Sequence, residues 1–217
     1  MLRTIISNEW FTVFIILGLC CITLSKHWFS SRFMDFIGVI GNSKYLKIYA
    51  RDQKFIDGFD TLLFINLVIS ISVFGYYSYI NLFTLGNFEI DVFLKLLFAV
   101  AALALIKILL ERLIGSLFEI DKLIDAYLFQ KTSYKNYCGF VLLPVNALIL
   151  YTIAPSKIII FSVIGLVFVI NLIGFMTSFK NHQKLLLNNL FYFILYLCAL
   201  EIGPYLILYK IIVEYKA

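Results

Sequence analysis

Charged residues are scarce in this 217-residue sequence: Asp, Glu, Lys and Arg make up 14% of it, whereas hydrophobic residues make up 62%. A soluble domain is about half apolar and about a quarter charged, so this chain lacks the polar groups needed to cover a water-exposed surface. The net charge of +5 is small, and because no run of basic residues occurs we expect no nucleic-acid partner. The expected solvent is the lipid bilayer.

Cysteine pairs and catalytic motifs are also lacking. Cys20, Cys21, Cys138 and Cys198 lie in or beside apolar segments, without the paired spacing of a disulfide framework or a zinc site. They are interpreted as small buried hydrophobic residues. No H-E-x-x-H, nucleotide-binding glycine loop or G-x-S-x-G motif occurs. We therefore expect no enzyme activity, no catalytic residue, no cofactor and no metal, and the sequence indicates no small-molecule substrate.

Long apolar runs, in contrast, recur along the chain. A helix needs about 20 apolar residues to cross a hydrocarbon core of about 30 Å. The sequence predicts an all-α, polytopic transmembrane helical bundle, a single domain over residues 1–217 with about six spans. The first span is the weakest, so five spans is the alternative. The expected spans are Ile5–Leu24, Thr61–Phe83, Val92–Leu110, Tyr137–Ile153, Ile158–Phe179 and Leu185–Tyr209.

Basic residues alternate between the connections. Six lie in Ser25–Asp60, none in the loop near residue 87, four between the third and fourth spans, one near residue 157 and two before the sixth span. Because base-rich loops stay in the cytoplasm, both termini are predicted to lie outside. Within the first loop, residues 27–55 mix aromatic and basic residues. This stretch either lies in the headgroup plane facing anionic lipid or packs on the helix ends.

A heptad pattern continues the third span. Apolar residues step by four and three from Ile106 to Tyr127, and only Gly115 weakens the helix before Thr132. We therefore expect helix 3 to extend into the cytoplasm as an amphipathic stalk. Its seam either packs on the protein's own first loop or docks onto another helix. The candidate docking residues are Leu113, Leu117, Ile120 and Ile124.

One carboxylate, Glu201, interrupts the last apolar run, "LYLCALEIGPYLILYK". It lies nine residues before Lys210, about 13 Å along a helix, which is deep for a charged group. Pro204 frees the carbonyl of Leu200, and Tyr205 falls on the same helical face as Glu201, so these residues form a polar kink. Lys95 is the nearest basic candidate by depth. Glu201 is either a protonated structural residue or a group that handles protons, ions or a charged partner.

The stretch "FYFILYLCALEIGPYLILYKII" also carries a family resemblance. It resembles the C-terminal signature of a Bacteroidota family of small inner-membrane proteins catalogued as a domain of unknown function. Weaker likenesses are Trp10, "SSRF", "YARDQ" and "CGFVLLPVNALIL". The resemblance implies a multi-pass protein of the bacterial inner membrane and supplies no activity.

Two functions from different classes are compatible with this sequence. The first is a non-enzymatic inner-membrane subunit that docks onto a larger cell-envelope complex, of the protein-export or motility type. Its partners would be the bilayer and a protein of that complex. The alternative is a small secondary transporter or ion-coupled carrier that uses Glu201.

Overall fold

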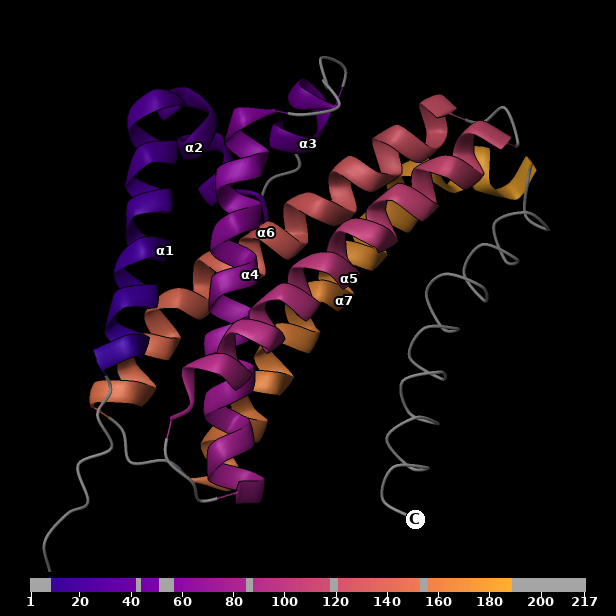
Figure 1. The fold of residues 1–217 in the computed structure, drawn as a ribbon. Coiled ribbons are helices and arrows are strands. Elements are labelled where there is room, and N and C mark those ends of the chain that lie inside the picture. The colour runs from indigo at the N-terminus through magenta and orange to yellow at the C-terminus, as the bar shows by residue number, and fades with distance from the viewer. Residues whose placement is uncertain are drawn as a thin grey trace, which may run out of the picture.

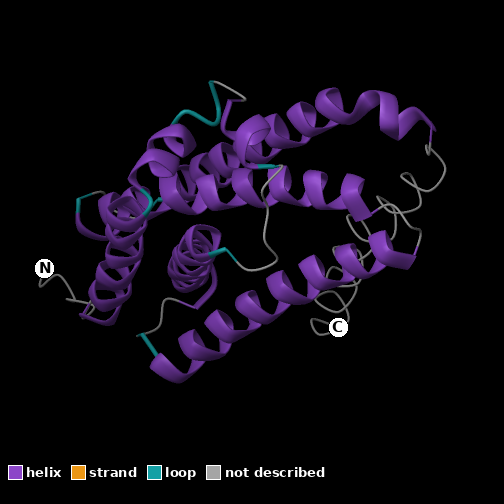
Figure 2. Ribbon diagram, turned by 90° about the horizontal axis from the view of Figure 1, so that it is seen from above, coloured by secondary structure: helices purple, strands orange, loops and turns teal. Residues whose placement is uncertain are grey.

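The computed structural model describes residues 9–41, 44–50, 57–84, 88–117, 121–152 and 156–188. In this part of the chain every regular element is a helix (Figure 2). The elements are α1 (Glu9–Trp28), α2 (Ser30–Ile37), α3 (Lys44–Tyr49), α4 (Gly58–Tyr79), the π-helical turn η1 (Ile80–Thr84), α5 (Ile90–Leu117), α6 (Asp121–Tyr151) and α7 (Lys157–Asn188). The predicted all-α class is confirmed.

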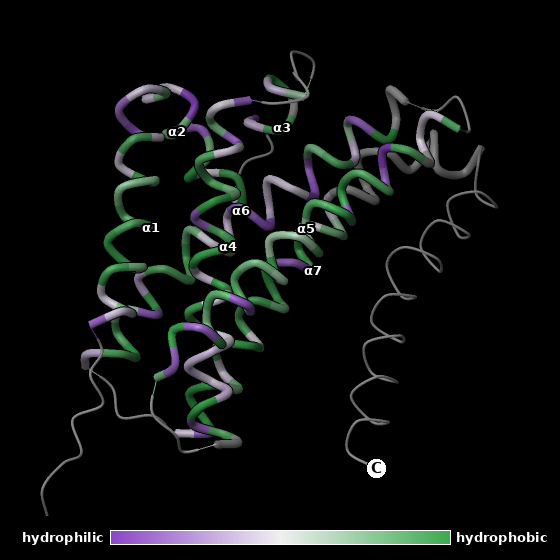
Figure 3. The backbone as a smooth tube through the Cα atoms, in the orientation of Figure 1, coloured by the Kyte–Doolittle hydropathy of each residue, from purple (hydrophilic) through white to green (hydrophobic). Residues whose placement is uncertain are grey.

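Four helices in the described residues are long and apolar enough to cross a membrane, which indicates a membrane protein. They are Glu9–Trp28, Gly58–Leu82, Ile90–Leu117 and Lys157–Thr177. They correspond to the first, second, third and fifth expected spans. The fourth overlaps α6 over residues 137–151. Residues 185–188 of the sixth still belong to α7, and the rest of that span lies outside the described residues. Figure 3 shows hydrophobic residues along α1, α4 and α5, with hydrophilic residues more frequent towards the upper end of the bundle.

The connections of the bundle lie at two opposite ends (Figure 1). α1 ends, α4 begins, α5 ends and α6 begins at the upper end, where α2 and α3 also lie. α4 ends, α5 begins, α6 ends and α7 begins at the lower end. We call the upper end the base-rich end, because the loops predicted to be rich in Lys and Arg meet there.

Helix α6 occupies the centre of the bundle and packs against α1, α4, α5 and α7. Its closest neighbour is α4: a Cβ atom placed on Gly139 would lie 2.5 Å from the Cα of Leu67. Glycine is therefore needed there for the two backbones to approach, as is common where helices pack within a membrane. The helix continues through Pro144 to Tyr151.

The predicted continuous helix from Ile106 to Tyr127 is wrong. Helix α5 ends at Leu117, α6 begins at Asp121, and the two pack against each other as a hairpin. Lys131 lies 2.5 Å from Glu111, although twenty residues of one straight helix would separate them by about 30 Å. A heptad of apolar residues cannot distinguish one long helix from two helices that fold back, because both bury the same stripe.

The segment after α1 packs on the helix ends, as one of its two interpretations expected. Phe33 and Phe36 of α2 and Tyr45 of α3 are buried against Phe59 of α4 and Phe129 of α6. The opposite surface of this segment carries exposed apolar side chains. These are Trp28, Met34, Ile37, Ile40 and Ile48.

Candidate functional site

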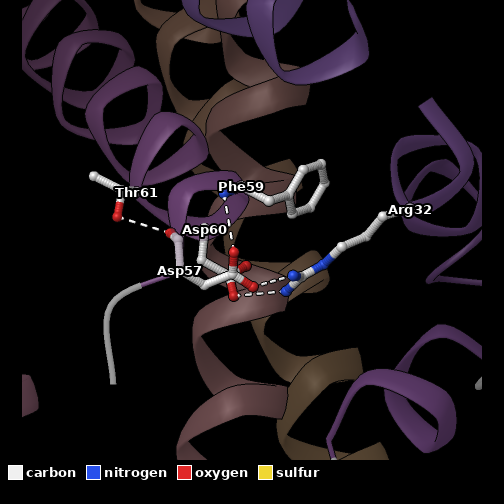
Figure 4. A network of polar contacts seen from close by, with 5 residues as sticks. All are labelled: Arg32, Asp57, Phe59, Asp60 and Thr61. Carbon is white, nitrogen blue, oxygen red and sulfur yellow. Dashed lines mark hydrogen bonds and ion pairs between the residues drawn. The ribbon is translucent and has the colours of Figure 1, made fainter. Parts of the chain in front are cut away.

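Three charged side chains meet at the base-rich end of α4. The guanidinium of Arg32, from α2, donates to Asp57 Oδ2 through one nitrogen and to Asp60 Oδ2 at 2.9 Å through the other (Figure 4). All three side chains are mostly buried. One planar guanidinium thus ties α2 to the first turn of α4, using the fork of donors that distinguishes arginine from lysine.

Asp57 also caps α4. Its Oδ1 accepts from the backbone N–H of Phe59 at 3.3 Å, and its carbonyl accepts from both the N–H and the hydroxyl of Thr61 (Figure 4). A carboxylate at this position satisfies free N–H groups and interacts favourably with the positive end of the helix dipole. This explains why α4 starts at Gly58 and why Asp57 and Asp60 can both remain close to its N-terminus.

Aromatic rings surround the guanidinium. Its Cζ lies 4.8 Å from the ring centre of Phe59, 5.1 Å from that of Tyr49 and 6.0 Å from that of Tyr45. Such distances allow cation–π attraction, which is stronger where water is excluded. Burial, and secondly the Asp60 carboxylate, raise the pKa of the Tyr45 hydroxyl well above its ordinary value. Tyr45 therefore stays neutral, and the two aspartates exceed Arg32 by one formal charge.

Buried polar side chains also lie along α4 and α6. The Tyr45 hydroxyl lies near Ser133 of α6, and Asn136 follows Ser133 by one turn. Farther along, Asn146 Nδ2 donates to the carbonyl of Ser70 at 2.8 Å. The buried polar residues of the two helices are Asn66, Ser70, Ser72, Gln130, Ser133, Asn136 and Asn146. These polar side chains are therefore enclosed by the bundle, and the Asn146–Ser70 bond joins α4 to α6.

A second charged group holds the α5–α6 hairpin together at the base-rich end. Glu111 is 1% exposed and accepts from Lys131 Nζ at 2.5 Å, while Arg112 pairs with Asp125 at 3.2 Å in a more exposed position. Gly115 allows the close approach, since a Cβ there would lie 2.9 Å from the Cβ of Ile124. The hairpin is thus fixed by one buried ion pair and one apolar contact.

The predicted docking seam is divided by this hairpin. Leu113 and Leu117, on α5, are 56% and 70% exposed, whereas Ile124, on α6, is 5% exposed. Ile120 lies outside the described residues. The exposed part of the seam therefore consists of the two leucines at the end of α5.

The predicted intramembrane polar site falls largely outside the described residues. Glu201, Pro204 and Tyr205 all lie there, so their proposed contact with Lys95 stays a prediction. Lys95 itself is exposed near the beginning of α5. Among the described residues, no three His, Cys, Asp or Glu side chains form a group that could hold a metal ion.

The comparison with known protein families covers most of the chain. The family described as "Domain of unknown function (DUF4271)" matches residues 11–212. The chain belongs to the DUF4271 family. This confirms the resemblance to a family catalogued as a domain of unknown function. No curated protein and no solved structure matches this DUF4271 chain.

Sequence reasoning missed the Arg32 cluster. Arg32 counted only as one of six bases in a loop, Asp60 only marked the end of that loop, and Asp57 was given no role. A signal was present: two carboxylates within four residues, directly before a long apolar run, are typical of a capped helix start. Their partner could not be identified, because 25 residues separate Arg32 from Asp57.

Proposed function

We propose that this DUF4271 chain is a non-enzymatic, multi-pass subunit of the bacterial inner membrane that docks onto a larger cell-envelope complex. The docking surface is the end of α5, formed by Leu113 and Leu117. The observation that carries this proposal is the exposure of both leucines beyond the buried pair of Glu111 and Lys131. The absence of catalytic motifs in the sequence is consistent with a role in assembly.

The position of these leucines along α5 distinguishes them from lipid-facing residues. Leu117 follows Ile90 by 27 residues, about 40 Å of helix, whereas the hydrocarbon core is about 30 Å thick. Lys107, Glu111 and Arg112 precede the leucines and mark the polar boundary of the bilayer. This order of residues supports a place for Leu113 and Leu117 at the end of α5 that approaches the headgroups.

The hairpin makes this end of α5 suitable for binding. The Glu111–Lys131 pair and the Gly115–Ile124 contact hold the two helices together, so the leucines need little further ordering when a partner binds. Two leucines one turn apart, with charged residues beside them, are typical of the apolar face that meets a partner helix.

Photo-crosslinking in native cells tests this function. A photoreactive amino acid at position 113 or 117 should form a discrete adduct with one other protein. Positions 98 and 103 are matched controls, because Phe98 and Leu103 are 74% and 55% exposed on the same helix at a depth where lipid is expected. These positions should give no discrete adduct. If positions 113 and 117 give none either, or if all four positions give the same pattern, the docking function is wrong.

A further inference from the structure

Helix α2 has an apolar surface that is wider than the part packed on the bundle. Phe33 and Phe36 lie three residues apart, share one side of the helix and are buried in the cluster that joins α2 to α4 and α6. Met34 and Ile37 have the same spacing and form the neighbouring strip of the helix surface. Both of these side chains are exposed. We call Met34 and Ile37 the exposed strip of α2.

Polar residues occupy the remaining side of α2. Ser31 is exposed, Arg32 pairs with the first turn of α4 (Figure 4), and Asp35 lies 3.4 Å from Lys44 Nζ of α3. The helix therefore has three sides: one against the bundle, one apolar and exposed, and one polar. A helix that lies along a bilayer surface needs such an arrangement, because its apolar side meets lipid while its polar side stays in water.

Two candidate spans indicate the depth of α2. Helix α1 has 20 residues, about 30 Å of helix, which matches the thickness of the hydrocarbon core, and it ends at Trp28. Only Phe29, whose backbone is not helical, separates α1 from α2. The ring centre of Phe36 lies 5.7 Å from that of Phe59, the second residue of α4. Helix α2 thus lies level with the end of α1 and the start of α4, at the boundary of the hydrocarbon core.

The residues around the exposed strip suit that boundary. Trp28 is exposed at the end of α1, and tryptophan is enriched at the level of the lipid headgroups. Lys26 is exposed in the last turn of α1, and the Lys44 side chain is 60% exposed at the start of α3. Long basic side chains at this level reach the phosphates of the headgroups. Apolar, aromatic and basic groups are thus combined as a lipid leaflet requires.

We propose that α2 is an interfacial helix whose exposed strip inserts between the lipids of the leaflet at the base-rich end. Because Arg32 ties α2 to α4, this lipid contact also holds the first turn of α4 at the bilayer surface. The strip is separate from the proposed docking end of α5, and its binding to lipid does not depend on that function.

Depth-dependent quenching tests the proposal. In a variant without native cysteines, the fluorophore bimane is attached to Met34→Cys or Ile37→Cys. The full chain is then placed in nanodiscs whose lipids carry a nitroxide either near the glycerol or deep in the acyl chain. Ser31→Cys is the matched control, because Ser31 is exposed on the polar side of the same helix. Leu19→Cys, at an exposed position near the middle of α1, is the reference for a deep position.

Lipid and water should reach opposite sides of α2. We expect the shallow nitroxide to quench positions 34 and 37 at least about threefold more strongly than position 31, and more strongly than the deep nitroxide does. The deep nitroxide should act most strongly on position 19. Aqueous iodide should instead quench position 31 at least about threefold more strongly than positions 34 and 37.

Tryptophan gives a second readout, which also serves if the variant without cysteines does not fold. Met34→Trp and Ser31→Trp are each made with Trp10 and Trp28 replaced by Phe, and brominated lipids replace the nitroxide lipids. The indole at position 34 should be quenched at least about threefold more strongly than the indole at position 31. The indole has no long linker, so this result reports the position of the helix itself. Circular dichroism compares the fold of each variant with that of the parent.

Other patterns of quenching would overturn the proposal. If iodide quenches positions 31, 34 and 37 equally, the strip faces water. If neither lipid nor iodide quenches positions 34 and 37, another protein segment or a second copy of the chain covers the strip. If the deep nitroxide quenches positions 34 and 37 as strongly as position 19, or if lipid quenches position 31 as strongly as position 34, α2 does not lie along the bilayer surface.

Discussion

Helices α5 and α6 are neighbours in the sequence and differ little in length, with 28 and 31 residues. They differ, however, in how many polar residues they contain and in how much of their surface is buried. Helix α5 is almost entirely apolar and exposes most of its side chains, including Phe98 and Leu103. Helix α6 begins with a long polar stretch and buries Gln130, Ser133 and Asn136 at the centre of the bundle. In a bilayer, an apolar surface can face outwards at no cost, whereas polar groups must be enclosed by protein.

The largest expected effect concerns the buried ion pair that joins the two helices. Glu111→Ala should destabilise the protein by about 3–5 kcal/mol, because Lys131 would lose its buried carboxylate partner. Arg112→Ala, in the exposed pair with Asp125, should cost less than about 1 kcal/mol. Unfolding by SDS in mixed micelles measures both values. Equal effects would show that the hairpin end is solvated and that the Glu111–Lys131 pair is not buried.

The next effect concerns the closest approach of α6 to α4. Gly139→Ala should cost about 1–3 kcal/mol, since the added Cβ would meet the backbone of Leu67. Gly165→Ala, on α7, is the matched control, because no atom lies within 4 Å of the added Cβ. The same micelle titration compares the two variants. A tolerated Gly139→Ala would mean that α4 and α6 lie farther apart than described.

A third prediction tests whether the last predicted span encloses a polar side chain in the protein, as α6 does, or faces lipid, as α5 does. If Glu201 is a protonated structural residue inside the protein, Glu201→Gln should fold and function normally, while Glu201→Leu should cost about 1–3 kcal/mol. Unfolding measurements on both variants, with an in vivo complementation assay, decide this. Loss of function in the folded Gln variant would favour the ion-coupled carrier instead.

The smallest effect is expected on the exposed face of α5. Leu103→Ala and Leu105→Ala should each change stability by no more than about 0.5 kcal/mol, because both side chains are about half exposed within the span and face lipid. SDS titration again provides the measurement. A loss above 1 kcal/mol would indicate that another protein segment covers this face.

The sequence predicted the outer helices of the bundle better than its centre. The first, second, third and fifth expected spans agree with helices in the structure, because long apolar runs in a bilayer have few alternatives to a helix. The beginning of α6 was instead assigned to a stalk of helix 3, since residues 121–127 continue the heptad of α5. The contacts that reverse the chain, Glu111 with Lys131 and Gly115 with Ile124, are tertiary and leave no local pattern.

The sequence by itself determined the helical class and the membrane environment, because these depend on composition and on the length of apolar runs. The family resemblance was carried instead by the motif in the last apolar run. Tertiary structure alone decided that Arg32 meets Asp57 and Asp60, and that Asn66 and Asn136 are buried inside the bundle. It also decided that Leu113 and Leu117 remain exposed while Ile124 is buried. The physical reason is that the hydrophobicity of a residue predicts only roughly whether its side chain faces lipid or the protein interior. Which polar groups share an interior depends on the side chains that distant helices bring together.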